Sequence, residues 1–428
     1  MSNVPALLPV TVISGFVGAG KSSLLKHLLA HTGGRRVAVI VNDRIVPNAG
    51  EVESAPATTR EASARSSSAP APSISAVRAK PAPAPEQERL IEMPRGCICC
   101  SLREDLLAAV RQLADEGKYD YLLIESGGVA EPLPVAEIFT YEDERGESLL
   151  DVARLDTLVT VVNTETFLAD WQSESDLRAR GIAVDEDDER SVSDLLVEQI
   201  EFANVLVLSK LDRVSREDGE RIEALLRQLN PEARIVRASH GEVAADAVLD
   251  TQLFDFEEAE QAPGWLAALR GEPAPADEKH GLQSFVYRAR VPFHPQRFWD
   301  LLADADTWDG VLRSKGFFWL ASRMDVSGLW SHAGGSAMCE GTGPWYAALP
   351  ESEWPEDPED CEQIREDWQE PWGDRRQELA FIGVELDEGA LRAKLDSALL
   401  SKKELAGGPE AWAKLDDPFP DWMGHAPA

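Results

Sequence analysis

The chain has 428 residues, of which 43% are hydrophobic and 28% charged, a balance typical of a globular protein with two or three domains. Its formal net charge of −34 argues against nucleic acid and against a membrane surface as partners, because like charges repel. The sequence has no bilayer-spanning apolar run and no signal-peptide pattern, so we expect a cytoplasmic protein with reduced thiols.

The first predicted element is a buried strand, PVTVIS, at residues 9–14, followed by GFVGAGKSS and a helix from Ser22 to about His31. The segment fits G-x-x-x-x-G-K-[ST] between a strand and a helix, the context of a phosphate-binding loop. Backbone N–H groups and the helix N-terminus would face the phosphates, Lys21 would reach the β and γ phosphates, and Ser22 would bind Mg²⁺. The residues predicted to contact the nucleotide here are Gly15, Gly18, Ala19, Gly20, Lys21, Ser22 and Ser23.

A second strand is predicted in RRVAVIVND, after which the composition changes. Residues 54–85 are nearly all Ala, Pro, Ser and Arg, cannot bury a core, and are predicted to be a disordered insertion. Order is expected to resume at ERLIEMPRGCICC, ahead of a helix that begins near Ser101. Ser101 and Glu104 would cap this helix, and Leu102, Leu106, Val110 and Leu113 would line its buried face.

Three of the five cysteines, Cys97, Cys99 and Cys100, lie within four positions just before this helix. The positive end of a helix favours thiolates, and thiolates are soft ligands that select Zn²⁺ and other late transition metals. Three thiolates leave a tetrahedral shell one ligand short, which suits a metal that is handed on. Glu51, Glu53 or a partner are candidates for the fourth ligand. Redox chemistry, a structural metal site and inert buried thiols remain alternatives.

Further strands are predicted at residues 119–126, 155–163, 203–212 and 233–239, with helices between most of them. Strands that alternate with helices predict a parallel sheet covered on both faces. The first of these strands ends in ESGG, which places Glu125 where an acidic side chain approaches Mg²⁺. The N–H of Gly128 would bond to the γ-phosphate. A structural strand end with a tight glycine turn is the alternative.

The strand at 203–212 ends in VLSKLD, which resembles the guanine-binding motif N-K-x-D. Ser209 stands where Asn is usual, whereas Lys210 and Asp212 are kept. Asp212 would accept two hydrogen bonds from guanine that adenine does not offer, and Lys210 would pack over the base. A strand end with a surface Lys and Asp is the alternative.

The second half of the chain differs in texture: eleven of the twelve tryptophans follow Gly264. Strands are predicted at 283–293, 313–322 and 376–386, and a helix at 387–400, which indicates a small α+β domain. The domains we expect are a P-loop GTPase domain at 1–245, a linker at 246–279, a C-terminal α+β domain at 280–404 and an irregular tail at 405–428.

Taken together, these residues resemble the CobW-type P-loop GTPases, a family of metallochaperones and metal-insertion factors. The resemblance rests on GFVGAGKSSLL, GCICCSLREDLL, IESGGVAEPLPVA, SKLD and RSKGFFWLAS, and runs along nearly the whole chain apart from residues 54–85. Segments such as DLLVEQIEFANVLVLSKLD look most like the zinc-responsive YciC-type branch. The resemblance implies a Ras-like α/β domain, slow GTP hydrolysis, the cofactors GTP/GDP, Mg²⁺ and Zn²⁺, and delivery of zinc to a client metalloprotein.

The sequence departs from the family pattern at Ser209, at Gly127, where Ser or Thr is usual, and in lacking a histidine-rich stretch. Three alternatives stay open at this point: cobalt or iron insertion into a cobalamin enzyme or a nitrile hydratase, a nucleotide-gated regulatory module without metal transfer, and a P-loop kinase. Association of identical chains is also left open.

Overall fold

The computed structural model describes residues 7–42, 88–93, 102–141, 146, 148–185, 188, 190–238, 241–355 and 357–422. The predicted insertion at 54–85, the cysteines at 97, 99 and 100, and the glutamates at 51 and 53 lie outside these residues. Two compact units are distinguished, one comprising residues 1–167, 175–216 and 233–259, the other residues 168–174, 217–232 and 260–428.

The elements of the first part of the chain alternate between strands and helices, as the sequence predicts. They are β1 (Leu8–Ser14), α1 (Lys21–Ala30), β2 (Val37–Val41), β3 (Glu88–Glu92), α2 (Arg103–Glu116), β4 (Tyr121–Glu125), α3 (Pro132–Glu137), β5 (Ala153–Asn163), α4 (Phe167–Trp171), α5 (Val192–Glu201), β6 (Val205–Ser209), α6 (Arg216–Leu229), β7 (Arg234–Arg237) and α7 (Phe256–Gln261).

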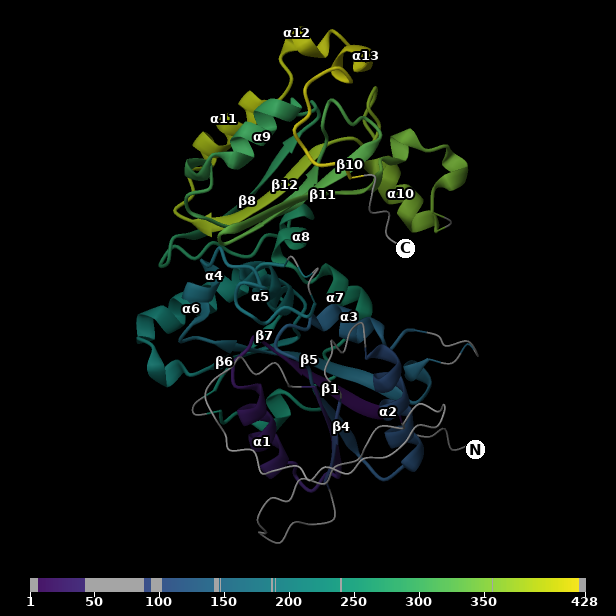
Figure 1. The fold of residues 1–428 in the computed structure, drawn as a ribbon, viewed down its shortest axis with the longest axis vertical. Helices are drawn as coiled ribbons and strands as arrows, with labels where there is room; N and C mark the ends of the chain where they lie inside the picture. Colours follow the sequence, from purple (N-terminus) through teal and green to yellow (C-terminus); the bar gives the residue numbers. More distant parts are fainter. Residues whose placement is uncertain are drawn as a thin grey trace, which may run out of the picture. The chain divides into compact units, whose positions relative to one another are not determined.

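Strands β1 to β7 form one seven-stranded sheet in the order β3-β2-β4-β1-β5-β6-β7, and each pairing is parallel. Its interior strands are buried on both faces, because alternate residues of β1 and β4 enter two different hydrophobic clusters. Helix α2 contributes Leu106, Val110 and Leu113 to one cluster, and helix α1 contributes Leu24 and Leu28 to the other. The two helices therefore cover opposite faces of the sheet, and the predicted parallel α/β fold is confirmed (Figure 1).

The start of α2 differs from its prediction. The helix begins at Arg103, with Leu102 in the N-cap position and no side-chain hydrogen bond at the cap. The expected cap residue, Ser101, lies outside the described residues. The predicted buried face is confirmed, because Leu102, Leu106, Val110 and Leu113 all belong to one buried cluster.

The remaining elements are α8 (Gly264–Leu269), β8 (Leu282–Ala289), α9 (Pro295–Ala303), β9 (Val311–Phe318), β10 (Val326–Ala333), β11 (Ser336–Pro344), α10 (Pro358–Glu366), β12 (Gln377–Val384), α11 (Glu388–Ala398), α12 (Lys402–Leu405) and α13 (Pro409–Trp412). The strands form a five-stranded antiparallel sheet in the order β11-β10-β9-β12-β8. Helices α9 and α11 lie together on one face (Figure 1) and bury Phe298, Leu391 and Leu395 there.

Two segments expected to be irregular contain helices. Within the segment expected to be a linker, α7 and α8 form, and Trp265 and Ala268 of α8 are buried against Ala380 of β12. Their spacing of three residues places both side chains on one helical face. In the expected irregular tail, α12 and α13 form, and Trp412 is buried, with its Nε1 donating to the carbonyl of Glu404 at 2.8 Å.

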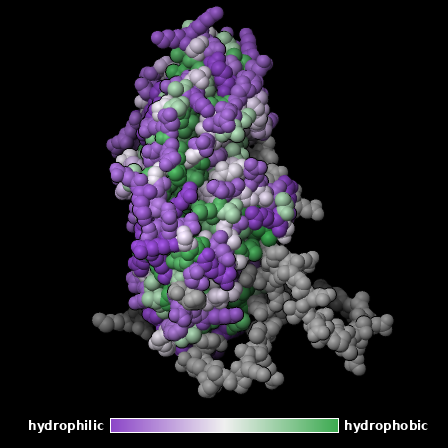
Figure 2. All heavy atoms as spheres, turned by 90° about the vertical axis from the view of Figure 1, so that its left-hand side faces the viewer, coloured by the Kyte–Doolittle hydropathy of each residue, from purple (hydrophilic) through white to green (hydrophobic). Residues whose placement is uncertain are grey.

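Hydrophilic side chains cover much of the face shown in Figure 2, as the net charge leads one to expect. Among the described residues, no helix is both long enough and apolar enough to cross a membrane.

Candidate nucleotide site

The predicted nucleotide residues meet at one edge of the parallel sheet. Strand β1 lies between β4 and β5, and β6 follows β5. Parallel strands present their carboxyl ends at the same edge, so the loop after β1, Glu125 at the end of β4 and Ser209 at the end of β6 are brought together. Ligands of open α/β sheets bind at this edge.

The loop after β1 depends on glycine at three positions. Gly15, Gly18 and Gly20 have φ values of 133°, 76° and 102°, a region that residues with a Cβ rarely adopt. A Cβ on Gly15 would lie 2.4 Å from the carbonyl oxygen of Val161 in β5, whereas a Cβ on Gly18 would meet nothing within 4 Å. The loop is therefore tied to the sheet at its start and open at Gly18, as a phosphate cradle requires.

Lys21 is the first residue of α1 and is only 4% exposed. Its Nζ donates to the carbonyl oxygens of Gly15 at 2.8 Å and Phe16 at 3.4 Å. The ammonium group thus lies inside the loop that precedes it, where it can turn toward bound phosphate. The N-cap position of α1 is Gly20, which has no side chain to cap the helix.

Ser22 and Glu125 contact each other directly at the start of α1 and the end of β4. The Ser22 hydroxyl donates to Glu125 Oε1 at 2.7 Å, and Glu125 is 1% exposed. A hydroxyl and a carboxylate are the hard oxygen donors that Mg²⁺ prefers, so this pair fits the predicted metal.

The segment after β4 is packed closely against the loop. A Cβ on Gly128 would lie 2.7 Å from Val17 Cγ2 and 3.0 Å from Val17 N. A Cβ on Gly127 would lie 3.3 Å from the carbonyl oxygen of Asn42, which is tight, so the family's usual Ser or Thr would require that carbonyl to shift. Gly128 is thus held beside the loop, where the sequence predicts that its N–H meets a γ-phosphate.

Helix α5 fixes this segment from its other side. The buried Gln199 donates through Nε2 to the carbonyl oxygens of Gly128 at 3.2 Å and Ala130 at 3.0 Å. Within the described residues, its Oε1 has no hydrogen-bond partner. The amide therefore serves as a double donor to the backbone that follows Glu125.

Arg190, just before α5, makes a second clamp on the same segment. Its guanidinium pairs with Glu131 and with Asp188, the latter at 2.9 Å, and donates to the carbonyl oxygen of Val129 at 3.3 Å. Burial opposes its charge, but the carboxylates of Asp188 and Glu131 hold the pKa of Arg190 above its ordinary value.

The motif SKLD lies on the opposite side of the loop. Ser209 donates from Oγ to the carbonyl oxygen of Ala19 at 2.7 Å and to that of Val162 at 3.1 Å. The serine thus connects β6 to the phosphate loop. Lys210 adopts a φ of 57° and begins the turn that carries the exposed Asp212. The Nζ of Lys210 lies 3.6 Å from Glu165.

The comparisons with known proteins bear on this arrangement. The sequence profile of the CobW/HypB/UreG nucleotide-binding domain matches residues 9–237, and that of the cobalamin synthesis protein cobW C-terminal domain matches residues 282–399. This chain belongs to the CobW/HypB/UreG family.

Three curated relatives extend the match. This chain is 41% identical over 424 residues to the zinc-regulated GTPase metalloprotein activator 1 of Dictyostelium discoideum. The matched region covers 96% of this chain and 84% of that protein. The chain is 32% identical to the zinc chaperone Rv0106 of Mycobacterium tuberculosis, over 78% of this chain and 80% of that one. It is 31% identical to the zinc chaperone CobW of Pseudomonas aeruginosa, over 57% and 60% of the two chains.

The predicted zinc ligands of this CobW-type chain, Cys97, Cys99 and Cys100, lie outside the described residues. Among the residues that are described, no three His, Cys, Asp or Glu side chains are grouped to hold a metal ion. The thiolate site therefore stays a prediction from the sequence.

Sequence reasoning missed Asn42, Arg190 and Gln199. Asn42 follows the buried strand β2, and its N–H donates to the carbonyl oxygen of Glu125 at 2.9 Å. A polar residue directly after a buried strand could have indicated this position. Gln199 lies one turn from Leu195 and Leu196 on the buried face of α5, where a polar side chain among leucines indicates a specific hydrogen-bonding role. No sequence signal sets Arg190 apart from other surface arginines.

Proposed function

We propose that this CobW-type chain binds and hydrolyses GTP and uses that cycle to carry zinc to a client metalloprotein. The observation that carries the proposal is the contact between Ser22 and the buried Glu125 beside an open phosphate loop. The curated relatives support the metal part, because their names describe a zinc-regulated GTPase metalloprotein activator and zinc chaperones.

Hydrolysis in this proposal depends on positioning and charge. The loop N–H groups and Lys21 would hold the β and γ phosphates, and Ser22 and Glu125 would hold Mg²⁺. Mg²⁺, when bound, neutralises charge that develops on the phosphate oxygens. Gly128, fixed by Gln199, donates its N–H to the γ-phosphate and so distinguishes GTP from GDP.

Guanine selection is assigned to Asp212, with Lys210 packed over the base. Ser209 fixes the start of this motif, because its hydroxyl connects the end of β6 to the Ala19 carbonyl of the phosphate loop. We expect about 10- to 100-fold preference for GTP over ATP, since unpaired buried polar groups cost about 1–3 kcal/mol.

The cargo site consists of Cys97, Cys99 and Cys100, which follow β3 in the chain and precede α2. Thiolates also bind Co²⁺ and Fe²⁺, but the relatives named as zinc proteins favour zinc over those metals. A cytoplasmic location, where thiols stay reduced, belongs to the same proposal. The proposal also includes domain limits at 1–245 and 280–404. It leaves self-association of the chain open.

The test is linkage between the two ligands. Zinc affinity is measured by competition with a chromophoric chelator, once with GDP and once with a non-hydrolysable GTP analogue. We expect tighter zinc binding with the analogue, and thermodynamic linkage requires zinc to tighten the analogue by the same factor, typically about 5- to 150-fold.

The variant Cys99→Ala serves as the control. It should lose tight zinc binding and the linkage while it keeps GTP binding, because the phosphate loop uses no thiolate. Equal zinc affinity in the two nucleotide states would refute the proposed switch.

A further inference from the structure

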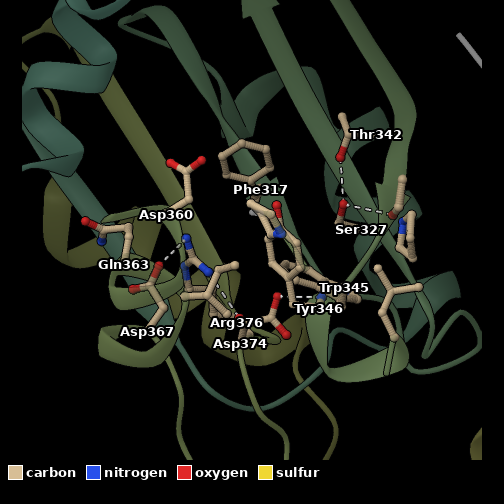
Figure 3. Close-up of a pocket in the computed structure, with 15 residues that line it drawn as sticks. Phe317, Ser327, Thr342, Trp345, Tyr346, Asp360, Gln363, Asp367, Asp374 and Arg376 are labelled. Atoms are coloured by element: carbon tan, nitrogen blue, oxygen red, sulfur yellow. Dashed lines mark hydrogen bonds and ion pairs between the residues drawn. The ribbon is translucent and has the colours of Figure 1, made fainter. Parts of the chain in front are cut away.

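The five-stranded sheet domain contains a cavity of about 660 Å³, a size typical of ligand pockets. It lies between the ends of β9, β10 and β11 and helix α10. In Figure 3, Asp360 and Gln363 of α10 form one side, Ser327 and Thr342 form the other, and Phe317 lies between them. The cavity therefore combines an aromatic floor with polar walls.

Most polar groups of the cavity are occupied by one another. Asp374 accepts from the backbone N–H groups of Tyr346 at 2.9 Å and Ala347 at 2.8 Å, and thereby holds the turn at Tyr346–Ala348. Arg376 pairs with Asp367 at 3.0 Å and with Glu378 at 2.6 Å. These contacts explain the structural roles of Asp367, Asp374 and Arg376.

Asp360 is different, because it is exposed at the cavity and has no hydrogen-bond or ion-pair partner among the described residues. Among the described residues that line the cavity, Arg376 carries the guanidinium, and it is already paired with Asp367 and Glu378. Asp367 and Asp374 interact with the guanidinium groups of Arg290, Arg375 and Arg376. The charge of the cavity that remains uncompensated is therefore that of Asp360, which favours a cation over an anion there.

The charge extends beyond the cavity. Residues 351–374, ESEWPEDPEDCEQIREDWQEPWGD, contain eleven acidic residues and a single basic one, Arg365. The same segment carries aromatic rings: Trp354 contacts Tyr346 at 6.1 Å and Trp368 at 5.7 Å between ring centres, and Trp368 is 36% exposed. A ligand that matches this surface has several positive charges and is larger than the cavity itself.

We propose that this cavity binds a lysine- or arginine-containing segment of a partner protein. One basic side chain enters beside Asp360, with its alkyl stem along Phe317 and Tyr346, and its neighbours face the acidic residues around α10. The inference rests on the proposed function, because the partner would be the protein that receives zinc.

The test uses the full chain and a fluorescein-labelled peptide, Gly-Lys-Ala-Lys-Phe-Lys-Gly-amide, with a second peptide in which Glu replaces each Lys. Fluorescence anisotropy at low salt should show binding of the lysine peptide only, and the affinity should fall as salt rises. Asp360→Asn should weaken it roughly tenfold, the loss expected for a charge-assisted hydrogen bond.

Glu362→Gln is the matched control: it removes one charge from the same helix, but Glu362 does not line the cavity. The affinity of the Glu362→Gln variant for the lysine peptide should stay within about twofold of that of the unmodified protein. Both variants should have the melting temperature of the unmodified protein, since both residues are exposed. Equal losses in the two variants, equal binding of the two peptides, or no binding of the lysine peptide would overturn the inference.

The same samples separate this inference from the proposed function. If GTP hydrolysis and the linkage between zinc and GTP persist while the lysine peptide does not bind, only the cavity assignment fails. If the peptide binds and depends on Asp360 while the linkage is absent, the cavity assignment stands and the chaperone cycle fails.

Discussion

Gln199→Leu tests whether the clamp on the segment after β4 serves the γ-phosphate. Leucine has nearly the volume of glutamine, so packing is kept while both donors are removed. The carbonyl oxygen of Ala130 still has the Ser14 hydroxyl at 3.5 Å, whereas no other hydrogen bond to the Gly128 oxygen is found in the described residues. The loss therefore falls mainly on Gly128.

Leaving a buried carbonyl unpaired costs about 1–3 kcal/mol. If the variant must order Gly128 each time GTP binds, a non-hydrolysable GTP analogue should bind roughly 5- to 150-fold more weakly, because 1.4 kcal/mol is tenfold in affinity. GDP affinity should stay within about twofold, since GDP has no γ-phosphate to meet Gly128. Both are measured by titration with fluorescent nucleotides, together with the rate of hydrolysis.

Gln228→Leu is the matched control. Gln228 is 3% exposed and donates through Nε2 to the carbonyl oxygen of Pro275 at 2.7 Å. Among the residues that the structure describes, its Oε1 also has no hydrogen-bond partner. The Gln228→Leu variant should lower the melting temperature by about as much as Gln199→Leu does, without changing the ratio of GTP affinity to GDP affinity. A parallel fall of both affinities in Gln199→Leu, or no change in either, would refute the clamp.

Three further predictions concern single contacts. Ser209→Ala removes the bond to the Ala19 carbonyl and should weaken GTP and GDP alike by about 5- to 10-fold, measured in the same titrations. Ser22→Ala removes the hydroxyl paired with the buried carboxylate, so nucleotide affinity should lose its dependence on Mg²⁺ when titrations with and without EDTA are compared. The Arg36 guanidinium donates to Asp120 and holds the pKa of that carboxyl at about 2. The Arg36–Asp120 pair therefore adds to the free energy of unfolding above the ordinary carboxyl pKa of about 3.9, and this contribution is lost as the pH falls through about 2. Arg36→Met should move the Asp120 titration toward 3.9, which NMR can follow.

Much of the nucleotide site could be predicted because its chemistry is local in sequence. The loop pattern fixes the positions of Gly15, Gly18 and Lys21 relative to β1 and α1, and parallel strands bring Glu125 to the same edge. These two facts bring Ser22 and Glu125 to the same edge of the sheet, and the structure shows their contact there. Gln199 could not be placed in the same way, because its role depends on how α5 packs against the backbone after β4.

The second half of the chain was less predictable. Strands β10 and β11 were missed because their glycines indicate loops in a sequence. Gly328 of β10 lies under the Phe318 ring, where a Cβ would be 2.4 Å from its Cζ, and a Cβ on Gly341 of β11 would be 2.7 Å from Trp422 Cβ. Gly328 makes room for Phe318 of the neighbouring strand β9, and Gly341 makes room for Trp422, and no local sequence pattern reveals either contact.

The position of Lys21 has a consequence for the thermodynamics of nucleotide binding. Because its ammonium group already satisfies the carbonyls of Gly15 and Phe16, the loop is stabilised in its working shape before any ligand arrives. Binding then exchanges one set of contacts for another and orders little additional backbone. Such preorganisation lowers the entropic cost of association, so the heat-capacity change on binding should reflect buried ligand surface and not the folding of a loop.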